Sequence, residues 1–158
     1  MQIGRYTIDN NSPTFIIAEL SANHNGSLDT ALDTIRAAAR AGADAIKLQT
    51  YTADTITIDS RKEDFMIKGT IWEGRNLHDL YAEAYTPWEW HARLFEAARA
   101  EGLECFSSPF DPMAVDFLEQ LKTELLAAHP GYYGELVWIL AMLEFWLRDH
   151  APDYQLAR

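Results

Sequence analysis

Charged and polar side chains end two short apolar runs in the first third of the chain. Phe15 to Ala18 has the composition of a strand buried on both faces, and Glu19 follows it. In the later run AIKLQT, Lys47 and Gln49 alternate with apolar residues and therefore share one face of a second strand. Because one helix separates the two strands, we expect Glu19, Lys47 and Gln49 to point at a shared opening.

Lys47 needs an anionic partner, because burying an unpaired lysine costs several kcal/mol. One partner is a carboxylate or phosphate group of a substrate, with Gln49 beside it. The other is Glu19, which would form a salt bridge across neighbouring strands. Both pairings can hold in turn, with the substrate anion displacing or sharing the carboxylate. A Schiff base on Lys47 is disfavoured, since nothing in the sequence supplies the desolvated apolar pocket that activates a lysine.

The segment between the two runs has the signals of a helix. Ser27 suits the N-cap, and Asp29 lies in the first turn, where the helix dipole favours a carboxylate. Apolar residues then recur at helical spacing until Gly42, which ends the helix. These apolar positions are Leu28, Leu32, Ile35 and Ala39. A short return leads into the strand at Ala45, so the two strands are predicted to run parallel.

The connection from Tyr51 to Tyr85 is far longer than the roughly two to six residues usual after a strand of this kind. Its apolar content predicts an ordered segment. We expect a short helix around Asn76 to Ala84, and we expect Phe65 to Trp72 to pack over the strand ends. The basic residues of this connection are either scattered surface charges or groups that face the opening. They are Arg61, Lys62, Lys68 and Arg75.

Two more helices and one more strand follow. Thr86 begins the sequence TPWE, a capping box with proline at the first helical position, and the helix is predicted to run to Gly102. Leu103 to Ser107 is the next strand. Asp111 then begins a third helix, again with proline at its first position.

The resulting order is strand, helix, strand, long connection, helix, strand, helix. This alternation predicts an α/β fold with three βα units and a parallel sheet, either open and doubly wound or part of an eight-stranded barrel. No glycine-rich nucleotide motif follows any strand, which disfavours a nucleotide-binding fold. Ile3 to Ile8 is predicted to form a small strand or hairpin below the sheet.

Composition limits the function classes. The chain has 158 residues, which is one-domain length, and a net charge of −11, which disfavours nucleic acid or an anionic membrane as a partner. No window is apolar enough for a membrane span, and no pair of cysteines is present. The first residues lack the pattern of a leader sequence, so none is expected. With Cys105 as the single cysteine, we expect a cytoplasmic protein without disulfides.

Four sequence runs carry a family resemblance. The run IIAELSANHNG, followed by IKLQTY, resembles the start of the sialic acid synthase family, whose members are similar to N-acetylneuraminate synthase. Phe65 to His91 and Cys105 to Asp111 are most similar to the branch that makes pseudaminic acid. The resemblance covers about Gly4 to Leu121. It implies a partial (β/α) TIM-type barrel in residues 1–121, with residues 122–158 as an unrelated helical tail.

The resemblance also implies a reaction and a set of site residues. Phosphoenolpyruvate would condense with an amino sugar, a 2,4-diacetamido-trideoxy hexose, to give a nonulosonic acid and phosphate. Glu19 and Lys47 are the implied catalytic residues, with Glu19 near the reacting carbon and able to handle a proton of the attacking water. The implied substrate-binding residues are Asn23, His24, Asn25, Gln49 and Ser108. Strand alternation alone does not choose Ser108 over Ser107, and ordinary turn chemistry also accounts for Asn25.

The family implies a divalent metal, manganese or magnesium, bound by two histidines of later strands. The histidines of this chain show no close ligand spacing, so no metal ligand is assigned. They are His24, His78, His91, His129 and His150.

The tail includes a helix predicted at Glu135 to Leu147 that is apolar almost all round. It either covers the exposed sheet or drives self-association into a homo-oligomer. Three strands cannot close an eight-stranded barrel, so we expect this chain alone not to catalyse the condensation. The alternative function is a non-catalytic remnant or interaction module that arose by gene truncation or fusion.

Overall fold

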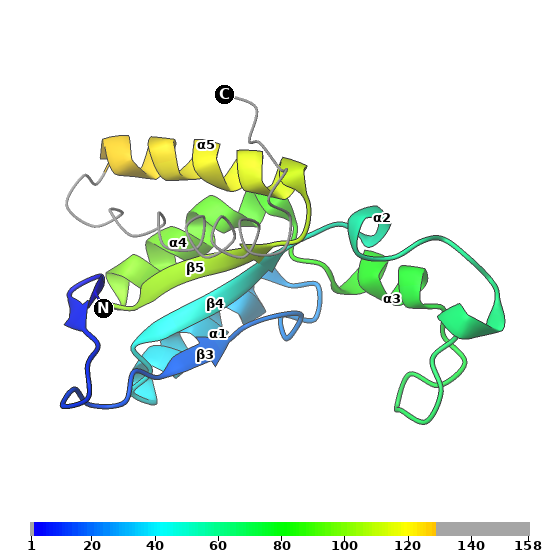
Figure 1. The fold of residues 1–158 in the computed structure, drawn as a ribbon, viewed down its shortest axis with the longest axis horizontal. Coiled ribbons are helices and arrows are strands. Elements are labelled where there is room, and N and C mark those ends of the chain that lie inside the picture. Colours follow the sequence, from blue (N-terminus) through cyan, green and yellow to red (C-terminus); the bar gives the residue numbers. More distant parts are fainter. Residues whose placement is uncertain (1, 129–158) are drawn as a thin grey trace.

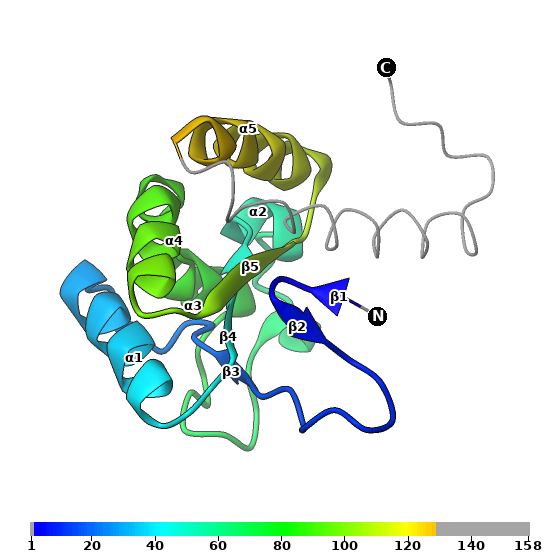
Figure 2. The ribbon, with the colours of Figure 1, turned by 90° about the vertical axis from the view of Figure 1, so that its left-hand side faces the viewer.

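The computed structural model describes residues 2–128, and its centre is a three-stranded parallel sheet. The strands are β3 (Ile17–Glu19), β4 (Ala45–Thr50) and β5 (Glu104–Pro109), in the spatial order β3-β4-β5. Three helices cover one side of this sheet: α1 (Leu28–Arg40), α4 (His91–Ala100) and α5 (Pro112–Ala128) (Figures 1 and 2). The predicted α/β class with a parallel sheet is therefore confirmed.

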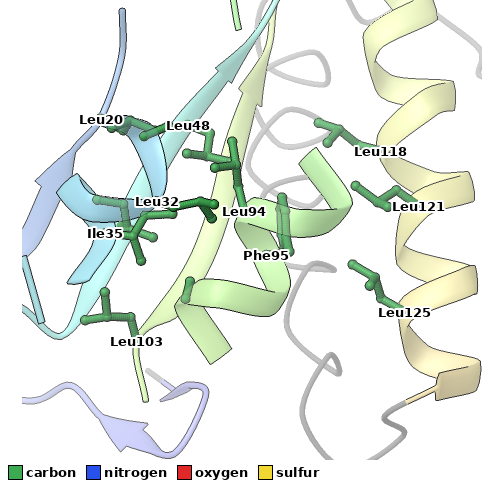
Figure 3. Close-up of a cluster of buried hydrophobic side chains, with 13 residues drawn as sticks. Leu20, Leu32, Ile35, Leu48, Leu94, Phe95, Leu103, Leu118, Leu121 and Leu125 are labelled. Atoms are coloured by element: carbon green, nitrogen blue, oxygen red, sulfur yellow. The ribbon is translucent and has the colours of Figure 1, made fainter. Parts of the chain in front are cut away.

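The hydrophobic core lies between the sheet and these helices (Figure 3). Ile46 and Leu48 enter it from β4, and both are completely buried. The helices and the segments next to the strands contribute Leu20, Leu32, Ile35, Leu94, Phe95, Leu103, Leu118, Leu121 and Leu125. Burial of this apolar surface is the main force that holds the helices on the sheet, at roughly 25 cal/mol per Å².

The first helix forms as its sequence predicts. The Ser27 hydroxyl accepts a hydrogen bond from the Thr30 amide at 3.3 Å, and α1 begins at the next residue. Ala31, Leu32 and Ile35 are its buried positions. The predicted N-terminal hairpin is also present, as β1 (Gln2–Ile3) paired antiparallel with β2 (Tyr6–Thr7).

The first sheet strand differs from its prediction. We expected Phe15 to Ala18 to be buried on both faces, but Ile16 is 53% exposed and Ile17 is 44% exposed. The reason is position, because β3 is an edge strand and pairs only with β4 among the described strands. Apolar composition alone cannot distinguish a central strand from an edge strand.

Residues 51–85, which we call the arm, connect β4 to α4. The arm contains α2 (Ala53–Ile56), the short 3-10 helix η1 (Glu63–Phe65) and α3 (Leu77–Ala84), so the predicted helix near Asn76 is confirmed. The arm extends away from the sheet beyond the ends of the strands (Figure 1). Ile71 is 88% exposed and Trp72 is 46% exposed. These two side chains therefore do not pack over the strand ends as expected.

Three of the four basic residues of the arm form local ion pairs. Arg61 binds Asp79 at 2.5 Å, and Lys68 binds Glu63 at 2.6 Å. Arg75 binds Glu83. For these three residues the structure favours the interpretation as surface charges over that as groups that face the opening.

The start of the second large helix also differs from its prediction. Thr86 was expected to cap a helix, but its buried hydroxyl instead lies 3.3 Å from His24 Nε2. The chain first makes a 3-10 turn, η2 (Trp88–Trp90), and α4 begins only at His91. A buried polar partner elsewhere in the fold has outcompeted the local cap.

The start of the last described helix agrees with its prediction. The Asp111 carboxylate accepts a hydrogen bond from the Ala114 amide at 2.9 Å, as an N-cap does. The helix then continues past Leu121 to Ala128. The apolar helix predicted at Glu135 to Leu147, as well as His129 and His150, lies outside the described residues. Within residues 2–128 no helix is long and apolar enough to cross a membrane.

Candidate active site

Four of the predicted site residues share one face of the sheet. In the parallel pairing Glu19 stands beside Lys47, and Gln49 stands beside Ser108. Residues paired in this way point to the same side, and the alternate β4 residues Ile46 and Leu48 point into the helix-covered core. Glu19, Lys47, Gln49 and Ser108, which we call the open face, therefore lie on the side of the sheet opposite these helices.

Lys47 and Glu19 form an ion pair on the open face. The Lys47 ammonium lies 2.5 Å from a Glu19 carboxylate oxygen. The Lys47 side chain is 26% exposed and that of Glu19 is 56% exposed. The salt bridge considered from the sequence is thus present, and the Lys47 side chain keeps an exposed part that a second anion can approach.

The loop that follows β3 holds the remaining predicted residues. Asn25 and Gly26 both have positive φ, 48° and 67°, and Ser21 has φ of 46°. The Asn23 side-chain amide donates to the Leu20 carbonyl at 3.0 Å. Its nitrogen therefore stabilises the turn, whereas the Asn25 side chain is exposed.

His24 requires a correction, because the sequence placed it among the residues that bind sugar hydroxyls. Its ring is only 1% exposed and packs edge-to-face on Trp90, with 5.4 Å between ring centroids. Nδ1 accepts a hydrogen bond from the Gly26 amide at 3.1 Å, and Nε2 lies next to the Thr86 hydroxyl. Burial lowers the pKa of His24, which favours a neutral ring with its proton on Nε2. His24 anchors the loop and does not present a free ring to a ligand.

A pocket of about 220 Å³ lies between this loop and the arm. Asn25 and Gly26 line it from the loop, and Trp72, Arg75, Leu80 and Glu83 line it from the arm. Trp72 and Arg75 were not among the predicted site residues. An aromatic and a basic residue within one glycine-containing turn were the signal for them, but a long insertion gives no register from which to place side chains.

The two adjacent serines of β5 lie on opposite faces of the sheet. Ser107 is completely buried on the helix-covered side, with its hydroxyl 2.6 Å from that of Thr50. Ser108 is partly exposed and lies beside Gln49. Ser108 is therefore the serine that a ligand on the open face could reach.

The described residues do not fit the implied metal. Among residues 2–128, no group of three His, Cys, Asp or Glu side chains could hold an ion. His78 is paired with Asp54 at 2.7 Å, and His91 is completely buried. Cys105 packs against the hydrophobic core, where burial raises the pKa of its thiol. No reaction step can be derived through a metal from these residues.

The fold and the Lys47–Glu19 pair give an α/β domain with a candidate anion site on the open face of a parallel sheet. The sequence model of the NeuB family matches residues 34–128. This chain belongs to the NeuB family.

Several curated relatives are pseudaminic acid synthases, among them one from Campylobacter jejuni and one from Helicobacter pylori. The one from Campylobacter jejuni is 58% identical over 120 residues, which are 76% of this chain and 34% of the relative. The one from Helicobacter pylori is 50% identical over 110 residues, which are 70% of this chain and 32% of the relative. The chain thus spans about a third of the length of the curated relatives it matches.

Solved structures show a similar fold. The N-acetylneuraminic acid synthetase of Leptospira borgpetersenii matches with a TM-score of 0.62 and 28% identity, over 77% of this chain and 38% of that one. The spore coat polysaccharide biosynthesis protein SpsE of Bacillus subtilis matches with a TM-score of 0.55 and 32% identity. That match covers 76% of this chain and 30% of the Bacillus chain.

Proposed function

We propose that this chain carries part of the active site of a nonulosonic acid synthase. The reaction would condense phosphoenolpyruvate with a 2,4-diacetamido-trideoxy hexose and release phosphate. The observation that carries the proposal is the Lys47–Glu19 pair on the open face, at 2.5 Å and accessible from one side. High identity to pseudaminic acid synthases over most of the chain supports this substrate pair.

Each residue of the open face then has a role. Lys47 and Ser108 bind the phosphate or carboxylate of phosphoenolpyruvate, because an ammonium and a hydroxyl are donors to anionic oxygens. Gln49 follows Lys47 on the same face of β4, stands beside Ser108 of β5 and offers a further amide donor. Glu19 handles the proton of the attacking water, because a carboxylate can accept a proton and its side chain is the more exposed of the pair.

The amino sugar is placed on the side of the loop that follows β3. Asn25 lines the pocket between this loop and the arm, and its amide can both donate to and accept from hydroxyl and acetamido groups. Asn23 lies in the same loop with its side-chain carbonyl available as an acceptor. We place the hexose here because the loop extends from the end of the strand that bears Glu19.

The three strands are proposed to be neighbouring strands of an eight-stranded barrel. Their parallel order agrees with that fold, and a closed barrel abolishes exposed strand edges such as that of β3. We further propose that these 158 residues alone do not turn over substrate. The described part of the chain offers no ligand set for the implied metal.

Ligand binding to the purified 158-residue chain tests the proposal. Isothermal titration calorimetry with phosphoenolpyruvate should show binding that Lys47→Ala weakens by at least about tenfold. Lys62→Ala removes the same charge from the exposed surface of the arm and should leave the affinity within about twofold. Equal affinities in both variants would remove Lys47 from the site.

Phosphate release tests the second part of the proposal. With phosphoenolpyruvate, the diacetamido hexose and manganese, we expect no turnover by this chain. A rate of about 1 per second or faster, as is typical of enzymes, would refute inactivity. Absence of both turnover and phosphoenolpyruvate binding would favour the alternative of a non-catalytic interaction module, which the exposed apolar edge at Ile16 and Ile17 also suits.

A further inference from the structure

A chain of buried hydrogen bonds lies directly behind the open face. Thr50 Oγ1 is 2.6 Å from Ser107 Oγ and 2.8 Å from His91 Nε2. His91 Nδ1 lies 3.3 Å from the Pro87 carbonyl oxygen. The contacts join the last residue of β4 to β5 and to the start of α4, so that three elements meet at Thr50.

The chemistry of the groups fixes the direction of each of these three hydrogen bonds. The Pro87 carbonyl can only accept, so His91 donates from Nδ1. Burial lowers the pKa of His91 to about 4, and the ring is therefore neutral with a free acceptor at Nε2. Thr50 donates its hydroxyl proton to that nitrogen, and its oxygen accepts the proton of Ser107. All three side chains have partners.

A serine, a threonine and an imidazole in contact could suggest a nucleophile with its base, but a substrate cannot reach these three side chains. Ser107, Thr50 and His91 are each 0% exposed. The Phe117 ring packs edge-to-face against His91, with 5.4 Å between ring centroids. The hydroxyls also point to the helix-covered side of the sheet, away from Lys47 and Glu19. The role of these contacts is therefore not covalent chemistry.

These buried hydrogen bonds can help to fix the register of β5 against β4. A slip of one residue would exchange the faces of all side chains, and Ser107 would replace Ser108 on the open face. Leu103, which immediately precedes β5, is buried and opposes such a slip by apolar packing. Further along, the smaller Cys105 packs on the core, while the larger Phe106 pairs with Lys47 on the other side.

We propose that Thr50, His91 and Ser107 are positioning residues that lock the ends of β4 and β5 in register, so that Gln49 and Ser108 both face the ligand. In the slip that brings Ser107 to the open face, Phe106 would take its buried place and the Thr50 oxygen would lose its hydrogen-bond donor. The role rests on the proposed function, in which Gln49 and Ser108 bind phosphoenolpyruvate. It assigns a task to residues that never touch the substrate.

The test compares three variants of the full 158-residue chain. Thr50→Val keeps the shape of the side chain but removes its hydroxyl, and Thr50→Ser retains the hydroxyl. Ser107→Ala removes one donor and leaves the Thr50 to His91 bond in place, which guards against a variant that fails to fold. Two readouts apply to each: the NMR signals of the Ser108 amide and the Gln49 side-chain amide, and the affinity for phosphoenolpyruvate.

We expect Thr50→Val and Ser107→Ala to shift both NMR signals and to weaken phosphoenolpyruvate binding by about tenfold, because small displacements of contact groups are costly. Thr50→Ser, which keeps the hydroxyl, should leave the NMR signals and the affinity close to those of the unmodified chain. Unchanged signals and affinity in Thr50→Val would overturn the lock, as would signal shifts that Thr50→Ser fails to restore. If the unmodified chain does not bind phosphoenolpyruvate, the proposed function fails, while the NMR signals still decide whether the lock exists.

Discussion

The two faces of β4 use alternate residues of one six-residue strand for different purposes. Ile46, Leu48 and Thr50 are completely buried against the helices, whereas Lys47 and Gln49 are only partly buried. The buried face is made of packing and one fully satisfied polar chain. The open face has little packing among the described residues and carries an accessible ion pair. Substitutions on the first face should therefore cost folding free energy, and those on the second should mainly cost binding.

The largest effect is expected for Leu48→Ala, because it opens a cavity in the core. Leu48 is 0% exposed and belongs to the main hydrophobic cluster. We expect a loss of about 2–5 kcal/mol in the free energy of unfolding, measured by urea denaturation. Gln49→Ala, one residue further on the other face, is the matched control and should cost less than about 1 kcal/mol. Similar losses in both variants would show that the faces do not differ as described.

The second prediction concerns His91 and pH. Its pKa in the folded protein is about 4, below the ordinary value of 6.5, because burial disfavours the charged ring. On acidification the unfolded chain takes up this proton first, so the stabilising contribution is complete above about pH 6.5 and falls as the pH drops toward 4. The full loss from this group is about 3 kcal/mol.

Urea denaturation at several pH values between about 7 and 4 measures this loss. His24, which also has a lowered pKa, contributes with the same sign. The comparison is therefore made with His91→Gln, which cannot titrate and should have a distinctly flatter pH profile. An identical profile in that variant would mean that His91 is not the group responsible.

The arm provides the third prediction. Asn76 is 3% exposed, accepts from the His78 amide at 2.9 Å and donates to the Ser60 carbonyl at 2.6 Å. Asn76→Ala removes the α3 cap and the hydrogen bond to the partly buried Ser60 carbonyl, which should cost about 1–2 kcal/mol. Limited proteolysis should then cut the arm faster, while hydrogen exchange in β4 stays unchanged. Faster exchange throughout the sheet would show that the arm and the sheet unfold together.

The sequence predicted those parts of the fold that depend on local signals and periodicity. The Ser27 cap, the buried Leu32 and Ile35 of α1, the Asp111 cap and the two faces of β4 agree with the structure. Leu28 and Ala39 of α1 are only partly buried, and Ala31 is buried in addition. The errors arise where a distant contact decides the outcome. Thr86 has a good local cap sequence, but its hydroxyl is next to His24, which is 62 residues away in the chain.

The candidate site shows the same division. Alternation along β4 was sufficient to place Lys47 and Gln49 on one face, and pairing across strands then brought Glu19 to Lys47. The alternation pattern could not choose between Ser107 and Ser108, since two identical neighbouring residues do not show which of them faces the ligand. His24 was misplaced because a polar residue in a loop is usually exposed, whereas this ring is buried against Trp90.

The smallest effect on stability is expected for the ion pair of the open face, although we place that pair at the centre of the site. Glu19 is more than half exposed, so water screens the pair and competes for both groups. In a double-mutant cycle with Glu19→Gln and Lys47→Met, we expect a coupling in the free energy of unfolding below about 1 kcal/mol. The same variants should still lower the affinity for phosphoenolpyruvate. A coupling well above that value would mean that Lys47 and Glu19 serve mainly to hold β3 on β4, and the open face would then be a structural surface.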